Sequence, residues 1–228
     1  MKSHRTIIGR SIGRYIGRNI EPSIGRRSAL LLALSAVVFA AGCSLTRPAP
    51  VKQTYLLDPR FPAQAATMQP GTLRIGTVNV AAPFRGRSFV VRDSEFRFDS
   101  DFYHEYFVPP GLMIADATAQ ALVRGKAFTV VTRPGVVVDA DWVLDGFVGA
   151  FHADARDAAK PAAVLEITYF LSRDDGGASA PVWSRAYAKR IAFATSSTDA
   201  YVTALNAALS EILAELARDL AAAQLPAR

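Results

Sequence analysis

The chain has 228 residues, with 26 Lys and Arg against 20 Asp and Glu, and a formal charge of +6 at pH 7. Residues 1–42 contain seven of those basic residues and a single acid, Glu21, so residues 43–228 hold 19 of each sign and carry no net charge. A neutral body lacks the basic surface that binding to DNA or RNA requires. The composition therefore gives no support to nucleic-acid binding, and no nucleic-acid partner is expected.

Cys43 is the only cysteine, so it cannot form a disulfide within the chain. It ends the string Ala40-Ala41-Gly42-Cys43, directly after an apolar run over residues 28–41. That run is shorter than the roughly 20 residues that a membrane-spanning helix needs, and basic residues precede it, as in a signal peptide. The segment resembles a bacterial lipoprotein signal with its lipidated cysteine.

This resemblance implies a signal peptide with a long basic n-region over residues 1–42, cleaved between Gly42 and Cys43. It also implies a covalent diacylglyceryl and N-acyl lipid on Cys43, and no other cofactor is expected. Two alternatives stay open, a buried core helix followed by a core cysteine and a twin-arginine export signal at Arg26-Arg27.

Residues 43–51 include Pro48 and Pro50, which disfavour a helix, and predict an extended, lipidated tether. The remaining residues, 52–228, are enough for one domain with its own core. Strands are expected first over residues 53–57, 72–80, 87–92 and 95–99, the last because Phe96 and Phe98 alternate with charged residues.

A first helix is predicted over residues 110–125, where Pro110 suits a first turn and Leu112, Ala115, Ala119 and Leu122 would form a buried face. Further strands are expected over residues 127–132, 141–152, 163–172 and 182–193, the last three as an antiparallel meander.

A final helix is predicted over residues 198–223. Its apolar residues recur at spacings of three and four, and Ser196 with Asp199 offers a capping box. The fold class is therefore a single α+β domain, in which a mainly antiparallel sheet is packed on one face by the two helices.

Groups that could perform catalysis are scarce after residue 43. His104-Glu105 begins like a zinc-protease motif, but Val108 stands where the second histidine belongs. Asp139, Asp141 and Asp145 resemble a sparse calcium loop, yet Ala150 occupies the position of the bidentate acid. The sequence predicts no catalytic residue and no metal site, so the chain is expected to act by binding rather than as an enzyme.

Several stretches together are similar to the family of ABC-type transport auxiliary lipoproteins. They are the residues after the tether (55–58), an aromatic segment (98–110), two strands (141–146 and 163–167) and the closing helix (204–209). The family includes the lipoprotein of the paraquat-inducible MCE transport system, from which the chain departs at Arg85-Gly86-Arg87-Ser88.

The resemblance implies a periplasmic partner of an MCE-domain protein and of an ABC permease and ATPase. Together these would move lipids or other hydrophobic compounds between membranes. Ser44 stands where inner-membrane lipoproteins commonly carry Asp, so the expected location is the periplasmic face of the outer membrane. Association of several copies stays open.

A partner-binding surface is predicted from residues that suit interfaces. Aromatic side chains supply much of the binding energy of an interface, and loops gather interaction residues. The predicted set is Phe102, Tyr103, Tyr106, Phe107, Arg85 and Arg87. The alternative for the aromatic residues is that they fill the core between the sheet and the first helix. One other protein class stays open, an outer-membrane assembly or cell-wall-synthesis accessory lipoprotein, whereas the scarcity of catalytic groups disfavours a secreted hydrolase.

Overall fold

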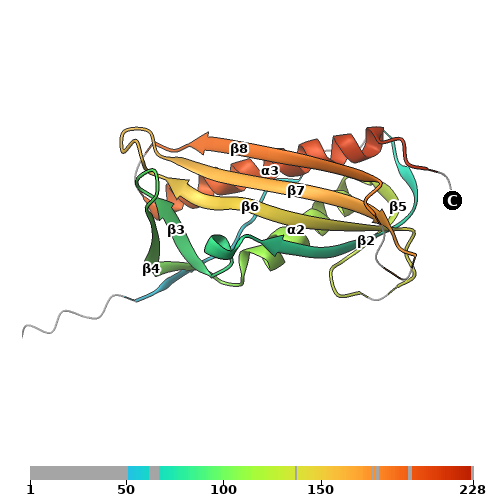
Figure 1. The fold of residues 1–228 in the computed structure, drawn as a ribbon, viewed down its shortest axis with the longest axis horizontal. Helices are drawn as coiled ribbons and strands as arrows, with labels where there is room; N and C mark the ends of the chain where they lie inside the picture. Colours follow the sequence, from blue (N-terminus) through green and yellow to red (C-terminus); the bar gives the residue numbers. More distant parts are fainter. Residues whose placement is uncertain are drawn as a thin grey trace, which may run out of the picture. The chain divides into compact units, whose positions relative to one another are not determined.

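The computed structural model describes residues 51–61, 67–136, 138–175, 177, 180–194 and 197–226 (Figure 1). The predicted signal peptide, its cleavage site and the lipidation site at Cys43 lie outside the described residues. The elements, in chain order, are β1 (Gln53–Tyr55), β2 (Gln69–Val80), η2 (Ala82–Phe84), β3 (Ser88–Arg92), β4 (Phe98–Tyr106), α2 (Pro110–Arg124), β5 (Phe128–Thr132), β6 (Trp142–Asp154), β7 (Ala162–Arg173), β8 (Trp183–Ala192) and α3 (Thr198–Ala222).

Eight strands in the described part of the chain form one mixed sheet. The predicted meander is confirmed, because β6, β7 and β8 pair antiparallel over nearly their full lengths. On its other edge β6 pairs in parallel with two strands. Its residues 142–148 pair with β2, and its residues 153–154 pair with β3, so β2 and β3 lie end to end beside β6. Antiparallel pairs, including β3 with β4, supply most of the paired residues.

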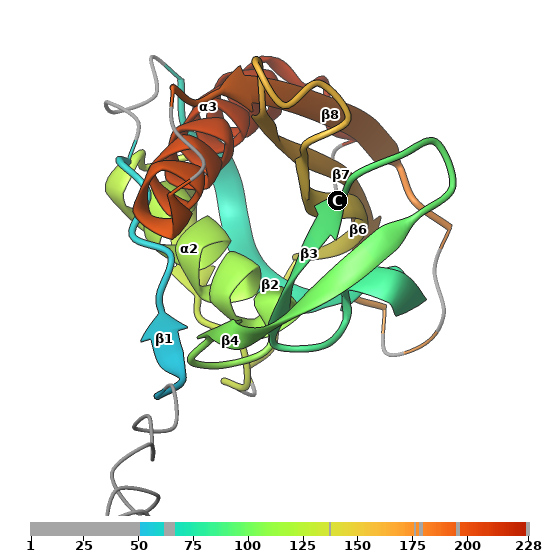
Figure 2. The same ribbon diagram turned by 90° about the vertical axis from the view of Figure 1, so that its left-hand side faces the viewer.

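Strands β2 and β5 are parallel, and parallel neighbours need a crossover connection. Helix α2 lies on that connection and packs against both strands. Helix α3 packs against β7 and β8, and it also contacts α2. Figure 2 shows the two helices together, with the strands of the sheet curving past them. The predicted α+β fold is confirmed.

The core forms between this helical layer and the sheet. Alternate residues of β7 from Ala163 to Leu171 are buried, which is the period-two pattern of a strand with one face inside. Every residue of the predicted stripe on α3 is buried: Val202, Leu205, Leu209, Ile212, Leu216 and Leu220. Since burying one such side chain contributes about 1.5–3 kcal/mol, this stripe fixes the helix on the sheet.

Three local predictions need correction. Leu112, assigned to one face of α2 with Ala115, Ala119 and Leu122, is 63% exposed, whereas the other three are buried and Gly111 makes the close approach to β2. Residues 93–97 form a turn, in which Asp93 N–H donates to the Arg97 carbonyl and Arg97 Nε donates to Asp93, and not a half-buried strand. Phe96 consequently lies 88% exposed. The N-cap of α3 is Ser197, whose hydroxyl accepts from Ala200 N–H, whereas Ser196 lies outside the described residues.

Gly111, in the first turn of α2, allows the helix to approach β2 closely. A Cβ at this position would collide with the Val78 carbonyl oxygen, a backbone atom that cannot rotate away. Gly111→Ala should therefore lower the free energy of unfolding by about 1–3 kcal/mol, although Ala is the better helix former. A urea melt measures the loss. Gly86→Ala is the matched control because a Cβ there meets nothing within 4 Å, and equal stability of both variants would contradict this packing.

Candidate partner-binding surface

A bulge in β4 turns two aromatic side chains outward. Ser88 pairs with Glu105 and Val90 with Ser100, so β4 advances five residues while β3 advances two. Asp101 holds the extra residues: its Oδ1 accepts the Tyr103 N–H at 2.7 Å, and its Oδ2 lies 2.6 Å from Nδ1 of His104. Bulges commonly re-aim side chains in this way.

The bulge and the end of β4 place three of the four predicted aromatic residues on the surface. Phe102 is 68% exposed, Phe107 is 59% exposed and Tyr103 is 44% exposed. The rings of Phe102 and Tyr103 contact edge to face at 5.3 Å between centroids. Large apolar groups exposed together in this way mark interaction sites.

Tyr106 is not part of this surface, and its assignment to partner binding is corrected. It is only 1% exposed, its ring packs 4.4 Å from that of Phe89, and its hydroxyl lies 3.1 Å from the hydroxyl of Tyr201 on α3. Burial strongly raises its pKa, so the hydroxyl stays neutral. Alternation along the last residues of β4 turns Tyr106 into the core, as the core alternative expected.

Charged side chains join the exposed aromatic residues. Glu105 forms ion pairs with Arg87 and, at 3.5 Å, with Lys52. Arg87 Nη1 also donates to the Phe107 carbonyl at 3.3 Å, and the Lys52 ammonium lies 4.9 Å from the centre of the Phe102 ring. We call Phe102, Tyr103 and Phe107, together with Lys52, Arg87 and Glu105, the aromatic surface.

The structure separates the two predicted arginines. Arg87 belongs to the aromatic surface, whereas Arg85 lies at the end of η2 and its Nε donates to the Val80 carbonyl at 3.4 Å. Lys52 and Glu105 were absent from the predicted set. Lys52 and Glu105 are far apart in the sequence, and their contact arises only because β1 pairs in parallel with β4, with Gln53 opposite His104. Sequence spacing therefore gives no sign of this ion pair.

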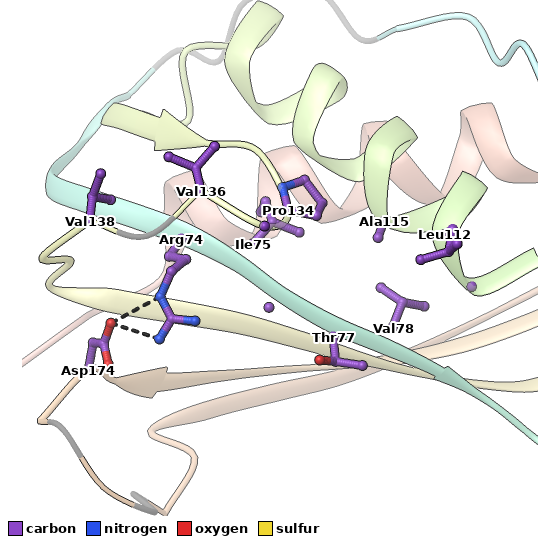
Figure 3. A pocket seen from close by; sticks show the side chains of 13 residues that line it. Arg74, Ile75, Thr77, Val78, Leu112, Ala115, Pro134, Val136, Val138 and Asp174 are labelled. Atoms are coloured by element: carbon purple, nitrogen blue, oxygen red, sulfur yellow. Dashed lines mark hydrogen bonds and ion pairs between the residues drawn. The ribbon is translucent and has the colours of Figure 1, made fainter.

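A second feature is a hollow of about 450 Å³ between β2, the start of α2 and the segment after β5. Its described lining is mostly aliphatic, with Ile75 and Val78 from β2 and Leu112 from α2 (Figure 3). At one end Arg74 donates to Asp174 through Nε at 3.1 Å and Nη2 at 2.8 Å. The hollow can receive an apolar group beside a paired charge.

The described residues contain no group of three or more His, Cys, Asp or Glu side chains placed to hold a metal ion. Of the helices that the structure describes, neither is long and apolar enough to cross a membrane.

The described residues fold as a small α+β domain with a mixed sheet. The chain belongs to the family of ABC-type transport auxiliary lipoprotein components, whose model matches residues 55–221. The predicted resemblance is thereby confirmed. A search among curated proteins finds no match.

Solved structures show the same fold. Protein XCC0632 from Xanthomonas campestris is 20% identical, with a TM-score of 0.65 over 74% of this chain and 95% of that one. A crystal structure of an uncharacterized protein is 16% identical, with a TM-score of 0.59 over 75% of this chain and 99% of that one.

Proposed function

We propose that the protein is a lipid-anchored periplasmic auxiliary component of an MCE-type ABC transporter, and that it assists the transport of lipids or other hydrophobic compounds by binding and not by catalysis. The observation that carries the proposal is the aromatic surface. Family membership supplies the transporter context, and the bulge at Asp101 presents Phe102 and Tyr103 to a partner while the domain core stays closed.

The chain enters the domain beside the aromatic surface. Lys52, at the start of the domain, contacts both Glu105 and the Phe102 ring. A lipid on Cys43 would be separated from Lys52 by nine residues, which span at most about 30 Å when extended. An anchored domain would therefore keep this surface within reach of components at the same membrane, which we place at the periplasmic face of the outer membrane.

Composition and charge favour a protein as the occupant of the aromatic surface. It combines three exposed aromatic side chains with two basic groups, Lys52 and Arg87, that are paired with Glu105. Aromatic residues are enriched in protein interfaces, where a few residues supply most of the binding energy. We assign the partner to the MCE-domain protein of the transporter, together with its permease and ATPase.

Alanine substitutions on the aromatic surface test this assignment. Phe102→Ala, Tyr103→Ala and Phe107→Ala should leave the free energy of unfolding within about 0.5 kcal/mol of the wild-type value, because these side chains lie outside the core. Each should weaken binding by about 1–2 kcal/mol or more, which is about tenfold in the dissociation constant. The measurement is capture of the MCE partner by the full chain, with a thermal melt of each variant.

The matched control is Phe96→Ala, since Phe96 is an exposed aromatic residue in the turn before β4 and outside the aromatic surface. It should capture the partner normally. Unchanged capture by all three surface variants would reject the aromatic surface as the docking site. Failure of the wild-type protein to capture any transporter component would reject the partnership itself.

A further inference from the structure

A second hollow, of about 500 Å³, lies at the C-terminal end of β6. Phe151 and Ala153 of β6 belong to the core cluster beneath the helices. Because successive side chains of a strand point to opposite faces, His152 and Asp154 lie on the other face of the sheet, where they line the hollow. The hollow is also lined by Arg92 of β3 and Arg190 of β8.

Three guanidinium groups converge at this end of the sheet around one buried carboxylate. Arg156 donates to Asp154 through Nε at 2.9 Å and through Nη2 at 2.7 Å, and Arg190 donates to the same carboxylate. These charge-assisted bonds hold the pKa of Asp154 far below its usual value. Asp154 is thus ionised and offsets one of the three positive charges.

Arg92 has no carboxylate partner among the described residues. Its guanidinium donates to the backbone carbonyls of Ser94 and Glu95 and lies 5.3 Å from the centre of the Phe98 ring. Arg156 and Arg190 keep about half of their side-chain surface exposed beside the hollow. Besides Asp154, the lining holds one further acidic residue, Glu166, in the middle of β7 and near Gly149.

His152 supplies an independent sign of a ligand. The residue is only 5% exposed, yet its Nδ1 is buried without a hydrogen-bond partner among the described residues. Leaving a buried polar atom unpaired is unfavourable. The rings of Phe84 and Phe98 cover the imidazole at centroid distances of 5.3 and 5.4 Å, and Phe98 is the more exposed of the two. Rotation of Phe98 would open the imidazole to a bound molecule.

We propose that this hollow binds a phosphate group, held by Arg92, Arg156 and Arg190 with His152 beside it. Guanidinium groups match phosphate because their planar N–H forks can donate in pairs to its several oxygens. Asp154 is a positioning residue, since it orients two of the three arginines. The group can come from free phosphate or from a phospholipid headgroup. This site uses residues outside the aromatic surface and does not depend on the proposed docking.

Burial lowers the pKa of His152 to about 4, Asp154 opposes this shift, and the charges of Arg92, Arg156 and Arg190 add to it. Besides these groups, Glu166 of β7 and Lys189 of β8 line the hollow, and the Lys189 ammonium is paired with Glu215 of α3 at 2.6 Å. The imidazole is therefore neutral at pH 7. An anion bound among the arginines favours the imidazolium form, so phosphate should raise the pKa of His152. This response gives a readout that a purely structural ion-pair cluster would not show.

The test uses the full lipidated chain in a nonionic detergent. Inorganic phosphate and dihexanoyl phosphatidic acid are titrated by calorimetry, and the His152 side chain is followed by NMR across pH. We expect binding of at least one probe, with an upward shift of the His152 titration. Arg92→Gln and Arg190→Gln should each weaken binding at least tenfold. Arg92→Gln removes no ion pair, so it serves if Arg190→Gln fails to fold.

Two controls accompany these variants. Arg218→Gln removes the same charge from α3, on the other side of the sheet, and should bind like the wild-type protein. Glu166→Gln removes a negative charge and should bind at least as tightly. Tighter binding of the phospholipid by tenfold or more would identify a headgroup site, and equal binding a site for free phosphate. Binding of neither probe by folded protein, or equal weakening by Arg218→Gln, would overturn the proposal.

Discussion

Cys43→Ser should abolish lipid attachment and leave the uncleaved precursor. The thiol is the acceptor of the diacylglyceryl group that the sequence around Gly42-Cys43 predicts, and a serine hydroxyl does not replace it. A single acyl chain gives only marginal membrane binding, whereas the predicted modification supplies three, so the wild-type protein should stay with membranes after a salt wash. Labelling with radioactive palmitate and the electrophoretic mobility of the product measure both effects.

Ser44→Ala is the control for this experiment, because it changes the neighbouring residue and keeps the acceptor thiol. It should be labelled and processed normally. Normal processing of Cys43→Ser would contradict the lipoprotein assignment of this site. Separation of the two membranes tests the location, and recovery of the wild-type protein only with the inner membrane would contradict the proposed outer-membrane site.

Leu209→Asp and Leu216→Asp should each prevent stable folding. Both leucines are fully buried on the face of α3 that packs against β7 and β8. Truncating a buried leucine to alanine costs about 2–5 kcal/mol, and an aspartate adds the cost of burying an unpaired charge. The total is comparable with the whole stability of a typical domain, about 5–15 kcal/mol. Circular dichroism and a urea melt measure the loss.

Thr203→Asp is the matched control, because Thr203 lies on the same helix with its side chain exposed. It should melt within about 0.5 kcal/mol of the wild-type protein. A native-like melt for Leu209→Asp would show that α3 does not complete the core.

The elements with a strong periodic pattern could be predicted from the sequence. The stripe from Val202 to Leu220 repeats at three and four residues, and the strands of the meander alternate or run apolar, so α3 and β6 to β8 follow from local order. The parallel pairing of β2 with β5 and β6 could not be predicted in this way, because it joins strands that are distant in the sequence and depends on the crossover through α2.

The candidate site was predicted in part for a related reason. Aromatic content indicated residues 102–107, but the faces of β4 are decided by the bulge that Asp101 holds through the N–H groups of Tyr103 and His104. Across that bulge the period-two pattern is lost, so exposed Phe102 and buried Tyr106 could not be told apart. The arginine cluster at Asp154 has no local signature, because its members come from β3, β8 and the region after β6.

Site-specific photocrosslinking in cells tests whether the aromatic surface docks onto the transporter. A photoreactive phenylalanine analogue is placed at Phe102 or Phe107 of the full chain, and at Phe96 as the control position. We expect crosslinks from positions 102 and 107, and not from 96, to the MCE-domain protein or its permease. Crosslinks from 102 and 107 only to components of outer-membrane assembly or cell-wall synthesis, or no transporter crosslink from either position, would contradict this docking.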